Sequence, residues 1–332
     1  MDIMISTISK EGYTLYPIIV PTEHNLRSIN FYLLEEAGSL TLIDAGWKTE
    51  VCGDYFTKTL SENGFSLQDL SRIIISHNHE DHVGMVNWIL EQKDIPIYAH
   101  AESIPRLKRD KHFFSMRIDF YKQLYEEMGC GAVGKQQIEE LHKASLEHET
   151  HKIQGDILTL NDKDTVGGLE AVSTPGHSPD HLVFYDAKRK WLFGGDHLIS
   201  HISSNAIVEP DQEGKRLLTL NQYMNSLKKC LTLDVDIVFP GHGELINQHK
   251  DLINKRLIRI DEKATKILNL IKSEGSTADQ VARTCYEHQY QNEFALVMSE
   301  IIGHLDYLEM QNRVQKELKG GVWHYYHTSK SV

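Results

Sequence analysis

The sequence lacks any apolar run close to the roughly 20 residues that a membrane-spanning helix needs. Its first residues, MDIMISTISKEGY, lack the basic and apolar blocks of a signal peptide. The 4 cysteines lie far apart and form no CxxC pair, which argues against a disulfide framework and against a cysteine-based zinc site. These absences predict a cytoplasmic protein that has no membrane partner.

An excess of positive charge is also missing, because the formal net charge is -12. Nucleic acid is therefore disfavoured as a partner, although a local basic groove remains compatible with this charge. The composition, with 40% hydrophobic and 25% charged residues in 332, is typical of a folded protein with one large and one small domain. The unusual number is 19 histidines.

Strand-like apolar runs bounded by Gly, Pro, Asn or Asp fill about the first 100 residues and return after about residue 156. Helical patterns alternate with them at about 49–64, 84–92, 214–231 and 249–272. Between the two β-rich parts, residues 101–148 are charged and helix-forming, with a glycine-containing break at 129–134. This pattern indicates a helical insertion, for which a lid over the site is one role. Two β-rich halves with flanking helices predict stacked sheets of the α+β class over residues 1–250.

The last part of the chain, residues 251–332, has a different pattern. Ser276 to Asp279 resembles a capping box that opens a short helix, a second helix is expected at about 292–310, and Gly320-Gly321 marks a hairpin. Helix, short helix, helix and hairpin in this order are typical of a winged-helix domain. From Asn254 onward, basic and acidic residues nearly balance, so we interpret this domain as a packing or homodimerisation module.

The stretch IIISHNHEDHVG places His77, His79, Asp81 and His82 directly after a strongly apolar strand. Such side chains are costly to bury together unless a divalent cation compensates them. His77 and His79 can point the same way, because alternate residues of an extended chain share a side. Asp81 and His82, where the chain enters a helix, can turn toward a neighbouring ion.

Three further candidate ligands follow later strand-like runs, namely His177, Asp196 and His242. His177 and His242 each follow a Pro-Gly turn that brings backbone close. A carboxylate such as Asp196 can bridge two cations, and neutral imidazoles suit zinc, iron and related metals. We therefore expect two divalent metal ions, zinc first and iron or manganese as alternatives, with room for a bridging hydroxide.

The ordered set HxHxDH, PGH, GD and PGH resembles the metallo-β-lactamase superfamily over about residues 10–250. The resemblance implies a four-layer αββα sandwich. It implies that one metal is held by His77, His79 and His177, that the other is held by Asp81, His82 and His242, and that Asp196 bridges them. It also implies that Asp44, at the end of LTLIDAG, orients the ligand loop from behind the ligands. We expect a similar supporting place for His181.

The chemistry that this site implies is hydrolysis by metal-activated water, with Asp81 and Asp196 as the catalytic carboxylates. His79 is an imidazole where related iron redox proteins carry glutamate, which favours a hydrolase. The first hypothesis is a metal-dependent hydrolase for an ester, thioester or lactone-type small molecule. In it the insertion shapes an acyl pocket, to which residues such as Phe114 and Tyr121 would lend apolar surface.

Two alternatives stay open at this point. One is a nuclease or phosphodiesterase that holds nucleic acid with the C-terminal domain. The other is a mononuclear iron enzyme such as a persulfide dioxygenase, if one metal site stays empty. The stretch GGDHLISHISSN and the tail are similar to the glyoxalase II-like and lactamase-like branch with a C-terminal winged helix, which includes thioesterases, lactonases and ribonucleases. Residues 197–200 lack the tyrosine that quorum-quenching lactonases carry there.

Overall fold

The computed structural model describes residues 7–23, 25–147 and 151–328. Its first sheet contains seven described strands in chain order. These are β1 (Ile8–Lys10), β2 (Tyr13–Pro21), β3 (Ser28–Glu36), β4 (Ser39–Ile43), β5 (Leu70–Ile74), β6 (Ile97–His100) and β7 (Ile157–Leu160). Strands β1 to β4 pair antiparallel, whereas β4 to β7 pair parallel. Parallel neighbours need crossover connections, so helices lie between the later strands.

The crossover helices of the first sheet follow the sequence expectation closely. They are α1 (Glu50–Glu62), the 3-10 turn η1 (Leu67–Asp69), α2 (Glu80–Val83) and α3 (Val86–Leu90). The Thr49 side chain caps α1 by accepting a hydrogen bond from the Cys52 amide at 3.2 Å. Cys52, Phe56 and Leu60, spaced four residues apart, bury one face of α1 against the sheet.

The second sheet has the strand order β12-β11-β10-β9-β8. Its strands are β8 (Thr165–Val166), β9 (Leu169–Ser173), β10 (Leu182–Asp186), β11 (Trp191–Gly195) and β12 (Ile237–Pro240). The expected turn at 186–189 does join β10 to β11, because the Asp186 carboxylate accepts hydrogen bonds from the Lys188 and Arg189 amides. β12 alone of these pairs parallel to its neighbour, after the helix α7 (Thr219–Leu231).

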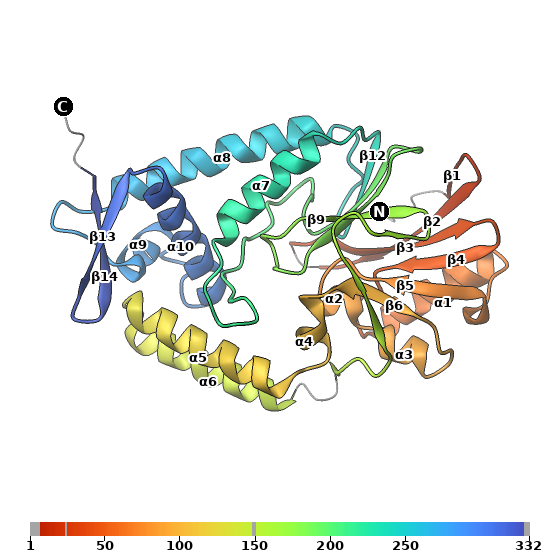
Figure 1. The fold of residues 1–332 in the computed structure, drawn as a ribbon, viewed down its shortest axis with the longest axis horizontal. Helices are drawn as coiled ribbons and strands as arrows, with labels where there is room; N and C mark the ends of the chain where they lie inside the picture. The colour runs from red at the N-terminus through yellow and green to blue at the C-terminus, as the bar shows by residue number, and fades with distance from the viewer. Residues whose placement is uncertain (1–6, 24, 148–150, 329–332) are drawn as a thin grey trace.

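Alternation along the strands produces four layers. In β3, Tyr32 and Leu34 face the second sheet, whereas Phe31 and Leu33 face α1 and α3. In the second sheet, Phe184 belongs to the core between the sheets, and its neighbours on the other face pack against α7 and α8 (His249–Leu270). The chain therefore forms the expected α+β sandwich of two sheets between helices (Figure 1).

The remaining helices and the hairpin, apart from α4 (Ser103–Leu107) of the insertion beside the sandwich, form the other end of the molecule (Figure 1). They are α5 (Lys111–Glu127) and α6 (Gly131–Glu147) from the insertion, and α9 (Ala278–Cys285), α10 (Phe294–Met310), β13 (Val314–Lys319) and β14 (Val322–His327) from the tail. Insertion and tail share one apolar core, in which Tyr125 and Met128 meet Ile267, Phe294 and Leu305.

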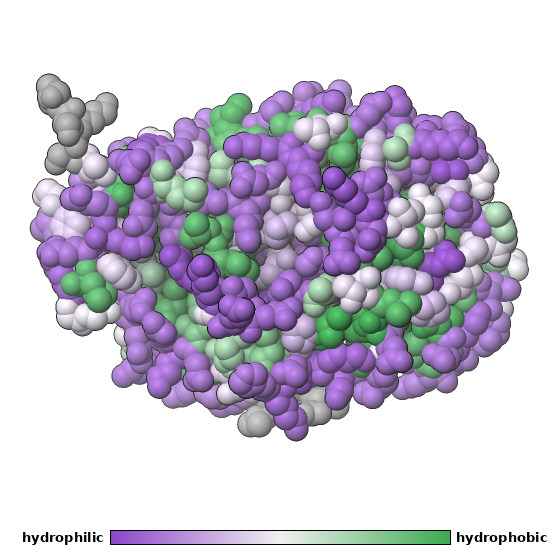
Figure 2. Space-filling view, in the orientation of Figure 1, coloured by the Kyte–Doolittle hydropathy of each residue, from purple (hydrophilic) through white to green (hydrophobic). Residues whose placement is uncertain are grey.

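Polar residues cover most of the face in Figure 2. No helix of the described residues is long and apolar enough to cross a bilayer.

Three local expectations were wrong in detail. The break between α5 and α6 covers only 128–130, and Gly134 lies inside α6 because its missing side chain lets Cys130 and Tyr125 pack close. Helix α7 begins at Thr219 rather than at 214, because Asp211 accepts hydrogen bonds from the Glu213 and Lys215 amides and closes a turn there.

The capping box of α9 is also shifted by one residue. It is formed by Thr277 and Gln280, whose side chains each accept a hydrogen bond from the other residue's amide. Ser276 instead pairs its backbone with Tyr325 of β14 at 2.9 and 3.1 Å. The tail thus has the expected order of helix, short helix, helix and hairpin, while its assignment as a winged helix stays a prediction.

Candidate metal centre

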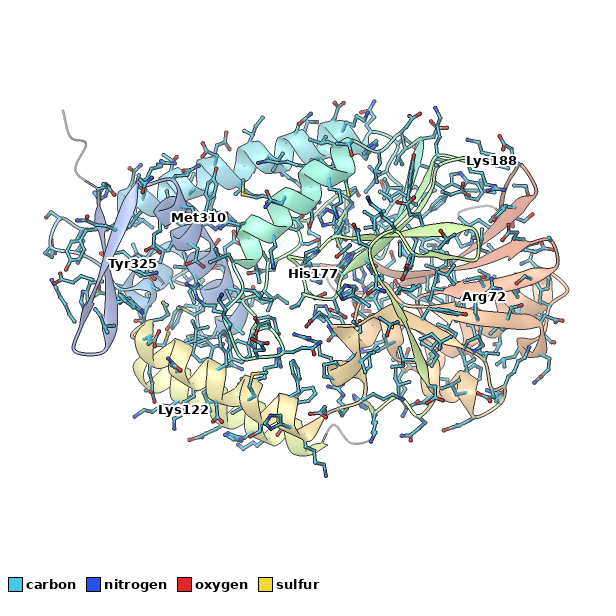
Figure 3. All side chains as sticks on the ribbon, viewed as in Figure 1. Arg72, Lys122, His177, Lys188, Met310 and Tyr325 are labelled. Carbon is cyan, nitrogen blue, oxygen red and sulfur yellow. The ribbon has the colours of Figure 1, made fainter. Side chains whose placement is uncertain are left out.

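The predicted ligands all lie in connections that follow strands of the sandwich. His77 follows β5, His79 precedes the first turn of α2, and Asp81 and His82 lie within α2. The later three follow β9, β11 and β12, and they are His177, Asp196 and His242. Figure 3 labels His177 near the middle of the molecule, between the sandwich and the helical end. Segments more than 160 residues apart thereby meet at one edge of the two sheets.

The first group consists of His77, His79, His177 and Asp196, whose ligand atoms all lie within 4.8 Å of one another. Nε2 of His177 lies 3.1 Å from Nδ1 of His79. It also lies 3.5 Å from Oδ2 of Asp196. Three ring nitrogens and one carboxylate oxygen thus converge on a space of the size that one metal ion needs.

The second group consists of Asp81, His82 and His242, again with ligand atoms within 4.8 Å of one another. Nε2 of His242 lies 3.2 Å from Oδ2 of Asp81. Oδ1 of Asp196 lies 3.3 Å from Nε2 of His82 and 3.2 Å from Nε2 of His242. The two oxygens of Asp196 therefore face different groups, which is the geometry that a bridging carboxylate requires.

Hydrogen bonds on the far side of each ring fix the direction of the near side. Nδ1 of His177 donates to the Asn205 carbonyl at 2.9 Å, and Nδ1 of His242 donates to the Ser28 carbonyl at 2.7 Å. His77 contacts the Ser76 hydroxyl through Nδ1 at 3.0 Å. A neutral imidazole that donates through Nδ1 offers a lone pair at Nε2, so these rings are oriented as metal ligands.

Asp44 and His181 lie behind the candidate ligands. Oδ1 of Asp44 accepts from the Ser76 amide at 2.7 Å, and Oδ2 lies 2.9 Å from Nδ1 of His82. Nε2 of His181 accepts from the Asp196 amide at 3.1 Å, while its Nδ1 contacts Thr174. Both residues touch the candidate ligands without belonging to either group.

Several buried ligand atoms have no hydrogen-bond partner among the described residues. They are Nε2 of His77, Nε2 of His82, Nε2 of His242 and Oδ1 of Asp196. Buried polar atoms are almost always satisfied, and unpaired ones are costly. Because these atoms face one another in two groups, divalent cations are the partners that fit them.

Burial lowers the pKa of His177 to about 4 and takes that of His77 well below its usual range, so both rings are neutral. Burial alone would lower the pKa of His242 as well. The negative charge of Asp196 has the larger effect and raises this pKa to about 10. Burial alone would raise the pKa of Asp81. The neighbouring rings of His82 and His242 have the larger effect and hold this pKa at about 2. A cation entering the second group therefore displaces protons from rings that the carboxylates otherwise keep charged.

Gly176 and Gly241 precede the candidate ligands His177 and His242. The lack of a side chain at each glycine lets other parts of the chain pack closely against these turns. A Cβ on Gly176, whose φ is +140°, would lie 2.4 Å from the Tyr223 backbone. A Cβ on Gly241 would lie 2.7 Å from Oδ1 of Asp196 and 2.7 Å from His82. Only glycine fits at the first position without moving the Tyr223 backbone, and at the second without moving a candidate ligand.

Residues that the sequence did not single out complete the site. Ser28 and Asn205 act through backbone carbonyls, which carry no sequence signal, whereas Ser76 was recognisable only as the neighbour of His77. Of the aromatic residues expected to shape a pocket, Phe114 lines a cavity next to His79, whereas Tyr121 packs into the core shared with the tail.

A family model described as the metallo-beta-lactamase superfamily matches residues 24–242. The chain belongs to this superfamily. It is 30% identical over 306 residues to a probable metallo-hydrolase of Bacillus subtilis (strain 168), YqjP, which covers 91% of this chain and 94% of that protein. It is 23% identical over 249 residues to an atrochrysone carboxyl ACP thioesterase of Aspergillus fumigatus, over 75% of this chain and 61% of that protein.

The fold is similar to the crystal structure of a metallo-beta-lactamase family protein from Thermus thermophilus. The TM-score is 0.76 at 23% sequence identity, and the match covers 94% of this chain and 98% of that one. The structural likeness therefore extends through the helical end as well as the sandwich. Superfamily membership and the His and Asp cluster together make this chain a metal-binding enzyme of the hydrolase kind.

Proposed function

We propose that this metallo-β-lactamase superfamily enzyme hydrolyses an ester, thioester or lactone-type bond of a small molecule. The observation that supports the proposal most is the convergence of seven His and Asp side chains into two groups that share Asp196. In the proposal, His77, His79 and His177 hold one ion, Asp81, His82 and His242 hold the other, and Asp196 bridges them.

A pair of divalent ions supplies a water of lowered pKa, about 7 in favourable zinc sites, and a Lewis acid for a carbonyl oxygen. The chain's own contribution is to hold the metal-binding side chains in fixed orientations. Ser28 and Asn205 hold two rings by their Nδ1 atoms, and Asp44 holds a third. Asp81 has a side chain that is 19% exposed, so its carboxylate can accept a proton and pass it to the leaving group.

Zinc is the metal that we propose, with iron and manganese as alternatives. Five imidazoles and two carboxylates suit zinc, and imidazole at position 79 favours hydrolysis over redox chemistry. A thioester is the bond that we favour, since a relative of the chain carries the name of a thioesterase. Phosphodiesters and persulfides serve as the comparison substrates, because a nuclease and a persulfide dioxygenase were the alternative hypotheses.

The test combines metal content with a substrate panel. Mass spectrometry of the purified protein is expected to find about two metal ions per chain, and hydrolysis is expected for thioesters before phosphodiesters or glutathione persulfide. Asp196→Ala and His77→Ala are expected to lose both metal and activity, while His142→Ala, on the exposed face of α6, keeps both. A wild-type rate of hydrolysis in Asp196→Ala would contradict the mechanism. A content of one iron ion per chain, together with oxidation of glutathione persulfide, would favour the persulfide dioxygenase instead.

We further propose that the catalytic domain spans 1–250, including the insertion at 101–148, and that 251–332 is a packing module. The apolar core that α5 and α6 share with α8, α9 and α10 supports this role. Homodimerisation of the tail is tested by light scattering of the full chain, and cytoplasmic location by fractionation of cells.

A further inference from the structure

A cavity of about 90 Å³ adjoins the first group of candidate ligands. His79 and His177 line it on one side, and Arg106, Arg109 and Arg117 line it from the helical insertion. Glu209 supplies the single carboxylate among the lining residues that the structure describes. In a chain of net charge -12, this is a locally positive pocket beside the reaction centre.

Two of the three arginines are paired with the carboxylate that lines the cavity, Glu209. Arg117 donates from Nε to both oxygens of Glu209, at 2.9 and 3.1 Å. Arg106 donates to the same carboxylate at 3.4 Å and also binds the Glu102 carbonyl at 2.7 Å. Arg106 and Glu209 are buried and Arg117 is half-buried, and the three side chains form one ion-pair network, so neither cation is available to a ligand.

Arg109 differs from its two neighbours. Its Nη2 forms an ion pair at 3.4 Å with Glu80, which does not line the cavity, and its buried Nε has no hydrogen-bond partner among the described residues. Ser178 lines the same cavity, and its hydroxyl is also buried without a partner within the described ranges. A charged donor and a hydroxyl donor thus line one small cavity unsatisfied, which indicates that a ligand supplies their acceptor.

We propose that this cavity binds a carboxylate at the far end of the substrate's acyl group, held by Arg109 with Ser178 as the second donor. The proposal rests on the proposed hydrolase function, because the metal centre fixes where the scissile carbonyl lies. The cavity touches His79 and His177 but not Asp81, the residue proposed to protonate the leaving group. The anionic group therefore belongs to the acyl part of the substrate.

The size of the cavity selects a small anion. One water molecule needs a cavity of roughly 10–15 Å³, so this space is several times larger than one water and suits a carboxylate with its adjoining methylene. Guanidinium and carboxylate form charge-assisted hydrogen bonds that are stronger than neutral ones. The enzyme should consequently prefer a thioester of a dicarboxylic acid to the thioester of a simple fatty acid of equal length.

Glutaryl and pentanoyl thioesters of N-acetylcysteamine test this preference, because they differ only in a terminal carboxylate in place of a methyl group. The wild-type protein is expected to favour the glutaryl thioester in kcat/KM by roughly tenfold to a hundredfold. Arg109→Gln is expected to bring this ratio close to one, and Arg109→Lys to an intermediate value. Arg259→Gln, on the exposed face of α8, keeps the wild-type ratio. A wild-type ratio of one or less overturns the proposal.

A binding measurement separates this proposal from the proposed function. Calorimetry compares glutarate with pentanoate on zinc-loaded wild-type protein and on Arg109→Gln, after thermal unfolding has shown that the variant folds. Tighter glutarate binding that Arg109→Gln removes supports the pocket even if no thioester is hydrolysed, in which case the hydrolase proposal alone fails. Equal binding of the two acids, or tighter binding of inorganic phosphate, overturns the carboxylate site.

Discussion

The carboxylate of Asp44 lies 2.9 Å from Nδ1 of His82, on the side of the ring that faces away from the candidate metal centre. The same carboxylate accepts hydrogen bonds from the Ser76 amide and hydroxyl at 2.7 and 2.8 Å. Asp44 has a φ of 58°, a left-handed conformation that Asp and Asn tolerate better than most residues. One side chain at the end of β4 thus orients the ring of His82 and anchors the residue before His77.

Asp44→Asn keeps the shape and the backbone conformation but removes the charge. We expect metal affinity to fall about tenfold to a hundredfold, because the partner behind a ligand sets its basicity and direction. Zinc competition with a chromophoric chelator measures this loss. Asp54→Asn, exposed on α1, is the matched control and should bind zinc as the wild type does. Unchanged affinity in Asp44→Asn would show that Asp44 has no role in orienting His82.

Gly241→Ala tests the close approach at the turn before His242. The added Cβ would lie 2.7 Å from Oδ1 of Asp196. Since the φ of Gly241 is not in the left-handed region, the effect is purely steric. We expect fewer bound metal ions per chain and a free energy of unfolding lowered by about 1–3 kcal/mol.

Gly53→Ala serves as the control for this glycine substitution. A Cβ on Gly53 meets nothing within 4 Å, and the residue lies inside α1. The control should therefore gain up to about 1 kcal/mol of stability from helix propensity and keep its metal. Full metal content in Gly241→Ala would mean that Asp196 can move aside without leaving the ions.

The site was more predictable from the sequence than its surroundings were. Candidate ligands at strand ends form an ordered motif, so His77, Asp196 and His242 could be singled out, and the structure places the first two in one group and His242 in the other. The carbonyls of Ser28 and Asn205 could not be foreseen, because every residue has a carbonyl and only the fold decides which one meets a ring.

The helical end shows the opposite case. Helical patterns indicated the insertion and the tail separately, but periodicity does not say which apolar faces meet. That Tyr125 of α5 packs with Phe294 of α10 follows from tertiary structure alone. For the same reason, no sequence pattern indicated that Arg109 would line a cavity beside His79.

Arg256→Met is expected to loosen the segment that holds His177. The buried Arg256 guanidinium donates to the Ile199 and Ile202 carbonyls and to the Tyr223 hydroxyl. Each buried acceptor left unpaired costs about 1–3 kcal/mol, so the free energy of unfolding should fall by roughly that amount or more. Amide hydrogen exchange over 199–205 should also become faster.

The exposed neighbour in the helix provides the control for Arg256. Arg259→Met changes the same residue type one turn later in α8 and should leave exchange over 199–205 as in the wild type. Protection that persists in Arg256→Met would mean that the segment is held by its own contacts, such as that of Ser204 with the Asp196 carbonyl.

Glu209 gives the stability of the chain a defined dependence on pH. Burial raises the pKa of Glu209, but Arg117 outweighs it and holds the pKa at about 2, below the ordinary value of 4.5. A carboxyl whose pKa is depressed by folding stabilises the folded state above its unfolded pKa. That contribution, roughly 3 kcal/mol, is lost as the pH falls from about 4.5 towards about 2.

Glu209→Gln is therefore expected to cost about 3–5 kcal/mol at pH 7, because the half-buried Arg117 loses its carboxylate partner and the buried Arg106 keeps only Glu102, at 3.6 Å. Urea unfolding of metal-free protein at a series of pH values measures this difference without interference from metal loss. The gap between wild type and variant should narrow as the pH falls below about 4.5, whereas exposed Glu213→Gln shows no gap at any pH. A gap that stays constant down to the acid limit would mean that Glu209 stabilises the fold through its packing and not through its charge.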